Sequence, residues 1–550
     1  MGWAKDSVLT KEASNVGIAI GVIALLQAAV LSLGFTSLTT DEYTRTLYAA
    51  SWAKTHLLPT DEWLPGHIWI LGTALKIRYD LFLTPRIVTY LFSLQCLLAL
   101  YLLARYLFNR WVALISICIL GSLQIYVYLS LTPLVDMVYY TFLLWFLYFL
   151  LRWLEQRQPA PFFAAALMLG FATTLRYEAW FIAALFSVYL LVRSIAELQR
   201  SRVAGTLIAL AVVWIVPCLW LAGNYIWHGD PLQIMGAYGG WIRFRLETES
   251  ISNWAALLFR TGSHICVLGL AGIWLSRSIV AREKLCLYLG LTFAPLVVLS
   301  VFTTGPGNVY AERYVGQYLL PLIPFCAHAV YCALIADRHR SPIGQLPSWP
   351  ALAIFSIYNL WLVYLKMSGH GGRLISLLTL AGISLSWRLL ELRRWMLLAA
   401  TLSPLALFIV LPRTRFALIS SDAHLRLYFV VLLTFYGLYL LRAKYSPEHR
   451  ATARFSARQW WSLGAGLLSI VLFYGLWGTF VDHPDFFHEA PRAGLHVRRL
   501  FDERILREDT KVLMQVSDWD FIVIPTMSNR PHNFMFDRYP YKKVAVPAAD

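Results

Sequence analysis

Charged residues are scarce in this sequence. Asp, Glu, Lys and Arg together make up 14% of its 550 residues, whereas hydrophobic residues make up 58%. No water-soluble domain sustains such a balance over this length, so the composition excludes a soluble protein. The apolar residues form continuous runs, and only helices and closed barrels satisfy their backbone groups in lipid. Because the runs are continuous, they predict an all-α polytopic membrane protein.

The sequence also lacks cysteines at the spacing of a metal site. The seven cysteines fall almost entirely inside apolar runs and do not have metal-site spacing, so they predict small buried core residues. The net charge of +16 is divided among short clusters between the runs. Basic clusters in that position face anionic headgroups, so we expect membrane lipid, and not nucleic acid, as a partner.

The apolar runs predict about 13–15 transmembrane helices, because roughly 20 apolar residues cross a bilayer. The first run lacks a small-residue cleavage site after it, so we expect a span and not a signal peptide. The candidate spans are 16–35, 85–107, 111–131, 134–152, 160–175, 178–193, 204–226, 254–275, 285–303, 315–336, 349–367, 374–391, 395–411, 425–442 and 461–480.

Positive charge orients these spans, since cytoplasmic loops carry the excess of Lys and Arg. Basic residues gather at every second turn, near 105–110, 152–157, 193–202, 277–284, 338–340, 388–394 and 442–458. We therefore expect a cytoplasmic N-terminus. The count of spans is odd, so the polar tail should lie on the extracytoplasmic side.

The chain divides into three expected parts. Residues 1–336 form a transmembrane module that includes a long first outer loop, 36–83; residues 337–481 add further spans; and residues 482–550 form a small extracytoplasmic α/β segment that can be incomplete. In this tail, 491–506 has helical spacing, whereas 512–516 and 521–524 are typical of short strands.

The first outer loop is long enough to be functional. Thr39 and Glu42 have capping-box spacing, which predicts a short helix. One face of this helix carries Asp41, Arg45, Tyr48 and Trp52. A second helix over 65–77 carries an apolar stripe, as an interfacial helix would; its members are Trp69, Ile70, Ala74 and Leu75.

Ionisable residues at the outer ends of the spans are the candidates for chemistry, because charge is expensive at membrane depth. Asp41 and Glu42 come directly after the first span. A carboxylate there can take a proton from an attacking hydroxyl or hold a metal ion, although Glu42 is also explained by its capping role. Asp61 and Glu62 compete for the same role, but they are equally typical of a helix start.

Two arginines also lie at the outer ends of the expected spans. Arg176 lies with Tyr177 and Glu178 between two spans, and Arg313 precedes Tyr314 in the loop before the tenth span. Arginine can hold a phosphate through two parallel hydrogen bonds. The alternatives are an Arg176–Glu178 pair that only fixes its turn and an Arg313 that only anchors the interface.

A further group follows the seventh span. It includes His228, Asp230 and Arg243 among aromatic residues, for which an ordinary interfacial belt is the favoured interpretation. His67 can face the same site, although a lone interfacial histidine is more often structural. Arg260 and His264 either line a cavity or turn toward the interface.

Taken in order, these motifs resemble the GT-C superfamily of membrane glycosyltransferases. They are most similar to the dolichyl-phosphate-mannose-protein mannosyltransferase-like family 39, which includes the aminoarabinose transferases. The segments that carry the resemblance are 39–43, 63–67, 175–180, 229–232 and 312–314. The Trp-Trp-Asp-Tyr-Gly signature is missing, which argues against an oligosaccharyltransferase.

The resemblance implies a role for each matching residue. Asp41 would be the base, Glu42 would orient the acceptor or a cation, and Arg176 and Arg313 would contact the lipid phosphate. The His-Pro-Pro or Lys-Pro-Pro signature of the family is replaced by the segment 64–67, Leu-Pro-Gly-His, which leaves open the donor contact from that loop. If a divalent cation such as Mg²⁺ or Mn²⁺ takes part, Asp41 and Glu42 would be its ligands.

The expected function is that of a glycosyltransferase of the plasma (inner) membrane. It would move a sugar, with inversion, from a polyprenyl-phosphate donor to an acceptor hydroxyl of a lipid, glycan or protein on the extracytoplasmic face. The alternatives are a transporter or lipid-linked sugar flippase and a GT-C-type glycan ligase. A transporter would place its charges near the midplane and often repeat its halves, and neither feature is found in the sequence.

Overall fold

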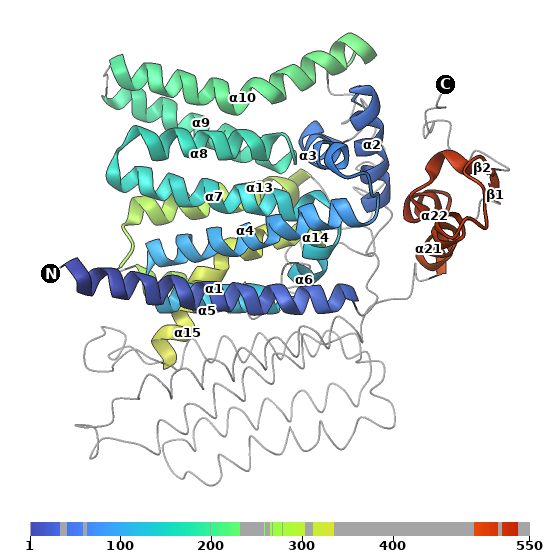
Figure 1. The fold of residues 1–550 in the computed structure, drawn as a ribbon. Coiled ribbons are helices and arrows are strands. Elements are labelled where there is room, and N and C mark those ends of the chain that lie inside the picture. Colours follow the sequence, from blue (N-terminus) through green and yellow to red (C-terminus); the bar gives the residue numbers. More distant parts are fainter. Residues whose placement is uncertain are drawn as a thin grey trace, which may run out of the picture.

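The protein is described from a computed structural model, which covers residues 2–32, 41–58, 63–197, 200–231, 258, 265–266, 268–277, 279–302, 312–334, 489–514 and 520–536. In Figure 1 long helices lie side by side in one bundle, with two short helices across one end of it. The prediction of a helical membrane protein is confirmed.

The elements follow in chain order. The helices are α1 (Gly2–Ser32), α2 (Asp41–Thr55), α3 (Pro65–Ile77), α4 (Leu83–Leu107), α5 (Arg110–Ser122), α6 (Gln124–Leu131), α7 (Val135–Gln156), α8 (Pro159–Thr173), α9 (Glu178–Glu197), α10 (Arg200–His228), α13 (Arg282–Phe302), α14 (Glu312–Leu319), α15 (Ile323–Leu334), α21 (Glu489–Asp502) and α22 (Asp520–Ser528). Two 3₁₀ turns, η1 (Leu320–Leu322) and η5 (Pro531–Asn533), and two strands, β1 (Val512–Met514) and β2 (Phe534–Phe536), complete them.

Within the described part of the chain, four helices are long and apolar enough to cross a membrane: α4, α7, α9 and α10. In the core of the bundle, α7 packs against both α4 and α8, and α10 covers α8. The expected spans between 349 and 480 lie outside the described residues, as does half of the span expected at 254–275.

Two expected spans are broken instead of continuous. The span expected at 111–131 is divided into α5 and α6, which meet at an angle of 72°; the break follows Gly121 and Ser122, a pair at which helices commonly kink. The span expected at 315–336 is divided into α14, η1 and α15, and Pro321 in η1 cannot continue a helical hydrogen-bond ladder. Both breaks lie near the residues discussed below as a site.

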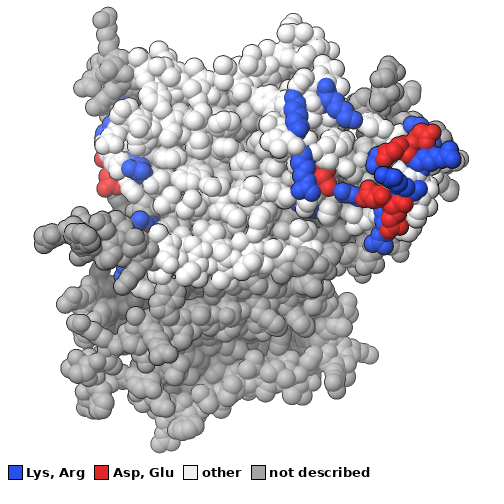
Figure 2. Space-filling view, in the orientation of Figure 1, with Lys and Arg blue, Asp and Glu red and all other residues white. Residues whose placement is uncertain are grey.

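The charged residues gather at the two ends of the bundle. Figure 2 shows a white, uncharged band between them. At one end Arg105 pairs with Glu12 at 2.8 Å and Lys284 with Glu155 at 2.9 Å, and these are basic residues expected in cytoplasmic turns. The outer-loop helices α2 and α3 lie at the opposite end (Figure 1), so the described charges are divided as the sequence predicts.

Helix α3 packs on α2 through a face different from the expected one. Its fully buried residues are Ile68, Leu71 and Leu75, whereas Trp69 and Ile70 of the expected stripe are half-buried. The contact is close because Gly72 has no side chain; a Cβ there would lie 2.9 Å from the carbonyl oxygen of Ala49. Only Leu75 belongs both to the expected stripe and to the fully buried residues, because packing on α2 buries a neighbouring face of the helix.

The C-terminal segment has the expected α/β character, but one expected strand is a helix. Residues 521–524, predicted as a strand from their Phe, Ile and Val content, belong to α22, and β1 pairs instead with β2 in parallel, with Val512 opposite Phe534. Helix α22 packs on α21 at Gly494, where a Cβ would lie 2.7 Å from the Ile524 carbonyl oxygen. Tertiary packing therefore overrides the β propensity of the segment.

This segment docks on the outer-loop end of the bundle. Val523 and Met527 of α22 form a buried cluster with Tyr43 of α2. Beside them Arg498 of α21 donates to Asp80 at 2.8 Å, and the Leu81 N–H donates to the Asn529 side chain at 2.9 Å. The C-terminal segment and α2 therefore support each other.

The Asp80–Arg498 pair makes this docking sensitive to acid. Burial alone would raise the pKa of Asp80, but the hydrogen bond from Arg498 and the backbone N–H groups of Leu83 and Phe82 outweigh it, so the pKa is lowered from 3.8. A lowered pKa stabilises the docked state above the ordinary value, and this contribution is lost as the pH falls through the lowered value.

We expect Asp80→Asn to increase protease cleavage and hydrogen exchange in 489–536 at pH 7, to about the level that the wild-type segment reaches below pH 3. Asp502→Asn is the matched control, because Asp502 is exposed and lies 3.7 Å from the same arginine; exposed pairs contribute only about 0–1 kcal/mol. Equal protection in the Asp80→Asn and wild-type proteins at pH 7 would contradict this role of the pair.

Candidate active site

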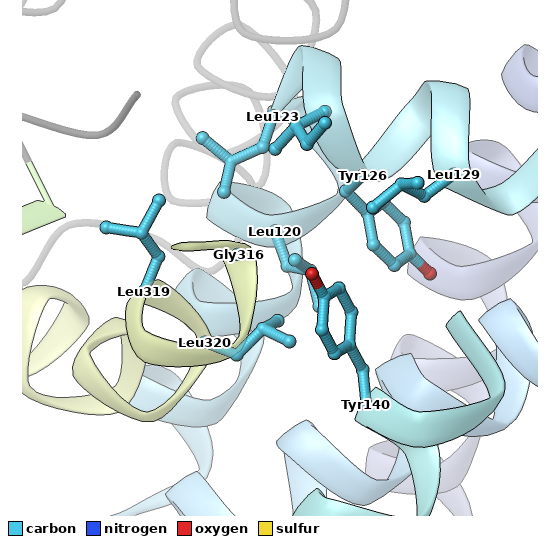
Figure 3. Close-up of a pocket in the computed structure, with 9 residues that line it drawn as sticks. Leu120, Leu123, Tyr126, Leu129, Tyr140, Gly316, Leu319 and Leu320 are labelled. Carbon is cyan, nitrogen blue, oxygen red and sulfur yellow. The ribbon is translucent and has the colours of Figure 1, made fainter. Parts of the chain in front are cut away.

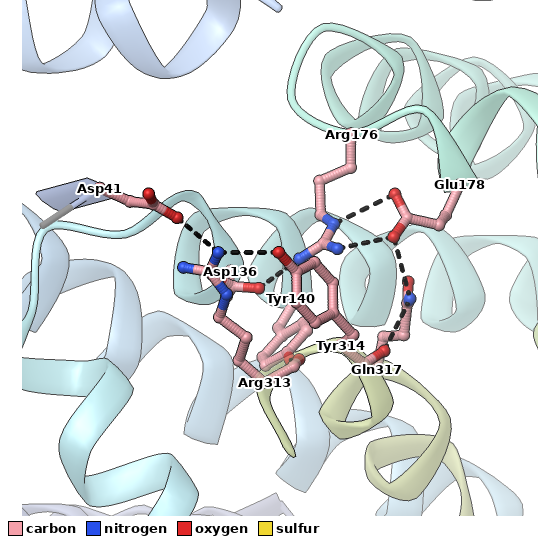
Figure 4. Close-up of polar contacts among 8 residues, drawn as sticks. All are labelled: Asp41, Asp136, Tyr140, Arg176, Glu178, Arg313, Tyr314 and Gln317. Atoms are coloured by element: carbon pink, nitrogen blue, oxygen red, sulfur yellow. Dashed lines mark hydrogen bonds and ion pairs between the residues drawn. The ribbon is translucent and has the colours of Figure 1, made fainter. Parts of the chain in front are cut away.

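An ion pair joins the first outer loop to a distant part of the chain. Arg313, near the start of α14, donates through Nη2 to Asp41 Oδ2 at the start of α2. Figure 4 shows these two side chains pointing toward each other across the end of the bundle. The arginine is held from behind, because its carbonyl oxygen accepts a hydrogen bond of 2.6 Å from Tyr140 of α7. The structure thus brings together two residues that the sequence analysis selected independently.

A second buried arginine lies beside the first. Arg176 donates to Asp136 and, through Nε and Nη2 at 3.2 and 2.6 Å, to both carboxylate oxygens of Glu178. The ring of Tyr314 lies between the two cations, with its centroid 5.2 Å from the guanidinium carbon of Arg176 and 4.8 Å from that of Arg313. Both arginines are 8% exposed, so the two guanidinium groups form one buried centre.

The turn that carries Arg176 is anchored on the outer loop. The carbonyl oxygen of Thr174 accepts a 2.9 Å hydrogen bond from the N–H of Gly66. A Cβ on Gly66 would lie 2.0 Å from the Thr174 hydroxyl oxygen, so only glycine permits this approach. The segment Pro65-Gly66-His67 therefore places the start of α3 directly against the Arg176 turn.

Arg45 and His67 extend the site toward α3. Arg45 lies one helical turn after Asp41 and stacks on Trp63, with its guanidinium carbon 4.3 Å from the ring centroid. Burial lowers the pKa of Arg45 to about 10, although Asp41 opposes the shift. His67 is fully buried, and burial together with the charge of Arg45 holds its pKa well below 6.5. His67 is therefore neutral at physiological pH.

Two expected site residues contact other parts of the fold. Glu42 is fully buried and accepts a 3.0 Å hydrogen bond from Arg86 of α4, which is 2% exposed. Removing one partner of a buried pair typically costs roughly 3–5 kcal/mol, so this pair holds α2 on α4. Tyr177 accepts a hydrogen bond of 3.3 Å from Trp220 of α10, which directs its side chain toward that helix.

Other expected candidates cannot be placed. Asp61, Glu62, Arg243, Arg260 and His264 lie outside the described residues. His228 and Asp230 are described, and both are exposed at the end of α10.

Sequence analysis missed Asp136, Arg86, Tyr140 and Gln317. Asp136 and Arg86 do carry a detectable signal, because each is a lone charge at the outer end of an expected span, a position that is usually functional or paired. Tyr140 and Gln317, which donates to Glu178 at 3.5 Å, carry no such signal. Their positions depend on how α7 and α14 meet.

An apolar groove opens beside the Arg313 centre. Figure 3 shows the side chains that line it, which come from α5, the α5–α6 junction, α6, α7, α14 and η1. Its lining residues are Leu120, Leu123, Ile125, Tyr126, Leu129, Tyr140, Gly316, Leu319 and Leu320. The groove follows from the α5–α6 break, and Tyr140 connects it to Arg313.

The carboxylates do not fit a divalent cation. Mg²⁺ and related ions need oxygen ligands that converge on one point, but Asp41 and Glu42 engage different arginines. In the part of the chain that the structure describes, no three His, Cys, Asp or Glu side chains gather as a metal site. The negative charges of Asp41 and Glu42 are neutralised by the guanidinium groups of Arg313 and Arg86 instead.

Comparison with known proteins gives this geometry a context. Residues 59–221 match the sequence profile of the family described as dolichyl-phosphate-mannose-protein mannosyltransferase. The fold is similar to crystal structures of ArnT from Cupriavidus metallidurans, one bound to undecaprenyl phosphate and one in the apo state. Their TM-scores are 0.52 and 0.51, each with 13% identity over 95% of this chain and 85% of that chain. Part of the chain thus resembles a family of membrane mannosyltransferases, and its fold is similar to that of ArnT.

Weaker comparisons add little. An oligosaccharyltransferase from Archaeoglobus fulgidus in the apo form has 15% identity over 94% of this chain and 64% of that chain, with a TM-score of only 0.38. No curated protein sequence matches the chain. The segment that matches the family contains Asp136, Arg176 and His67, whereas Asp41 and Arg313 lie outside it.

Proposed function

We propose that this protein is a GT-C glycosyltransferase that transfers a sugar from a polyprenyl-phosphate donor to an acceptor hydroxyl, with inversion. The observation that carries the proposal is the pair of buried arginines on the two sides of Tyr314, with Asp41 bound to one of them. Two cations and a carboxylate in one buried centre are the groups that such a transfer needs.

The arginines would hold the phosphate of the donor. Buried guanidinium groups bind phosphate strongly, and within the described residues the buried Nε donor of Arg313 has no hydrogen-bond partner. As the bond from the anomeric carbon to the phosphate oxygen breaks, negative charge grows on the leaving polyprenyl phosphate. Fixed positive charge at that position stabilises the transition state more than the ground state.

Asp41 would act as the base. It is 36% exposed, so an acceptor can reach it. The acceptor oxygen would attack the anomeric carbon from the face opposite the phosphate, and its proton would pass to the Asp41 carboxylate.

The lipid tail fits the apolar groove. ArnT, whose fold is similar, has been crystallised with undecaprenyl phosphate, which supports a long isoprenoid carrier as the donor class here. The groove between α6 and α14 is entirely apolar in its lining, and its residue Tyr140 bonds to Arg313. A tail in this groove would leave its phosphate at the arginine centre.

The same end of the bundle would face the extracytoplasmic side of the plasma (inner) membrane. Support comes from the basic residues at the opposite end, since positive charge is retained in the cytoplasm. In this orientation the N-terminus is cytoplasmic. Residues 1–336 would carry the catalytic groups, and the described part of the C-terminal segment, 489–514 and 520–536, docks beside α2.

Replacing Asp41 with Asn should abolish sugar transfer. The amide can still accept a hydrogen bond from Arg313 but cannot take a proton, and general bases contribute about 10²–10⁴-fold to rate. The measurement is turnover in membranes supplied with a polyprenyl-phosphate sugar, with expression checked and Asp502→Asn as control. Unchanged turnover in the Asp41→Asn protein would reject Asp41 as the base.

Replacing Arg176 or Arg313 with Lys should raise the apparent KM for the lipid donor about tenfold or more. Lysine preserves the charge near the carboxylates but cannot form the paired hydrogen bonds of a guanidinium group. Arg499→Lys, at an exposed position of α21, is the control. If neither variant changes the donor KM, the phosphate assignment is wrong.

A further inference from the structure

His67 is a buried polar side chain that the proposed transfer does not use. Its side chain is 0% exposed, and among the residues that the structure describes neither ring nitrogen has a hydrogen-bond partner. The neighbouring Arg45 has a buried Nη1 donor in the same state. An unsatisfied buried polar group costs about 1–3 kcal/mol, so two of them side by side need an explanation.

Specific contacts fix the positions of His67 and Arg45. Gly66 brings the first turn of α3 against Thr174, which sets His67 beside the turn that carries Arg176. Arg45 is fixed by its stacking on Trp63. These contacts position the unsatisfied atoms next to the catalytic groups rather than in the apolar core.

The chemistry of this pair selects one class of ligand. A neutral imidazole offers one donor and one acceptor, and each hydroxyl of a sugar both donates and accepts. A phosphate dianion can only accept hydrogen bonds, so it would leave the acceptor nitrogen of the imidazole without a donor. A cation would be repelled by the positive charge of Arg45. A polyhydroxylated ring is therefore the class that satisfies both residues.

The order of contacts agrees with a polyprenyl-phosphate sugar. The apolar groove includes Tyr140, which bonds to Arg313, and Arg313 bonds to Asp41. Arg45 follows Asp41 by one helical turn, and its charge acts on His67. The apolar groove, the two arginines and the His67–Arg45 pair therefore follow one another in the same order as the lipid tail, the phosphate and the sugar of the donor.

We propose that His67 and Arg45 form the subsite for the hydroxyl groups of the donor sugar. The inference rests on the proposed function, because it assumes a polyprenyl-phosphate donor at the arginine centre. This subsite makes the enzyme bind the sugar-loaded carrier more tightly than the bare carrier that leaves after transfer.

The test compares the binding of two kinds of lipid by the full chain in nanodiscs. The probes are undecaprenyl phosphate and undecaprenyl phosphate linked to mannose, glucose or 4-amino-4-deoxyarabinose, and the quantity is the ratio of their dissociation constants. We expect wild type to prefer at least one loaded carrier. His67→Leu should reduce that preference about 5–150-fold, the range for 1–3 kcal/mol, and leave bare undecaprenyl phosphate binding unchanged.

Two further variants make the result specific. His67→Gln keeps one donor and one acceptor and should recover part of the preference. His328→Leu is the matched control, because His328 is also buried but stacks on Phe108 in another part of the bundle, with ring centroids 4.2 Å apart; its preference should equal that of wild type.

Three results would overturn the subsite. They are a wild type that binds the bare carrier but prefers no loaded one, a His67→Leu protein that keeps the full preference, and a His67→Leu protein that loses both lipids equally. If wild type binds none of the lipids, the proposed donor class itself fails, and the subsite fails with it. The thermal unfolding temperature of each variant shows that the chain is folded.

Discussion

The contact between Asp41 and Arg313 is the interaction on which the rest of the site depends. The two residues are 272 positions apart, so their meeting requires that the first outer loop and α14 converge at the same end of the bundle. Other contacts serve this convergence. Glu42 and Arg86 hold α2 on α4, Tyr43 packs α2 against the C-terminal segment, and Tyr140 holds the backbone of Arg313.

Charge burial explains why these residues form a network and not isolated pairs. Moving single charges out of water is costly unless opposite charges and hydrogen bonds surround them. Arg176 and Arg313 are therefore matched by Asp136, Glu178 and Asp41. The same requirement pre-organises the centre, because side chains that satisfy one another before the donor arrives need little rearrangement when it binds.

Much of this end of the molecule could be predicted from the sequence. The helix after the first span and the helix 65–77 follow from capping and apolar spacing, and α3 begins and ends at the predicted residues. Polar residues at the outer ends of spans pointed to Asp41, Arg176 and Arg313. These three side chains lie at the same end of the bundle, because lipid restricts charged residues to the ends of the spans.

The remaining features depend on packing that a single sequence does not encode locally. The strand expected at 521–524 is a helix because α21 and α22 meet at Gly494. Glu42 and Asp41 are neighbours in sequence, yet successive helical residues face different directions, which sends one to Arg86 and the other to Arg313. Asp136 is a lone charge at the end of an expected span, but its pairing with Arg176 depends on α7 lying beside the turn that carries the arginine.

Cross-linking of engineered cysteines tests the central contact most directly. In a chain whose native cysteines are replaced, Asp41→Cys together with Arg313→Cys should be joined in native membranes by a short bis-maleimide reagent, which replaces the reach of the arginine side chain that touches Asp41 in the structure. The pair Asp230→Cys and Arg313→Cys provides the background rate. Rapid cross-linking of the 41–313 pair is the predicted result; cross-linking no faster than this background would show that the two residues do not meet, and would contradict the account.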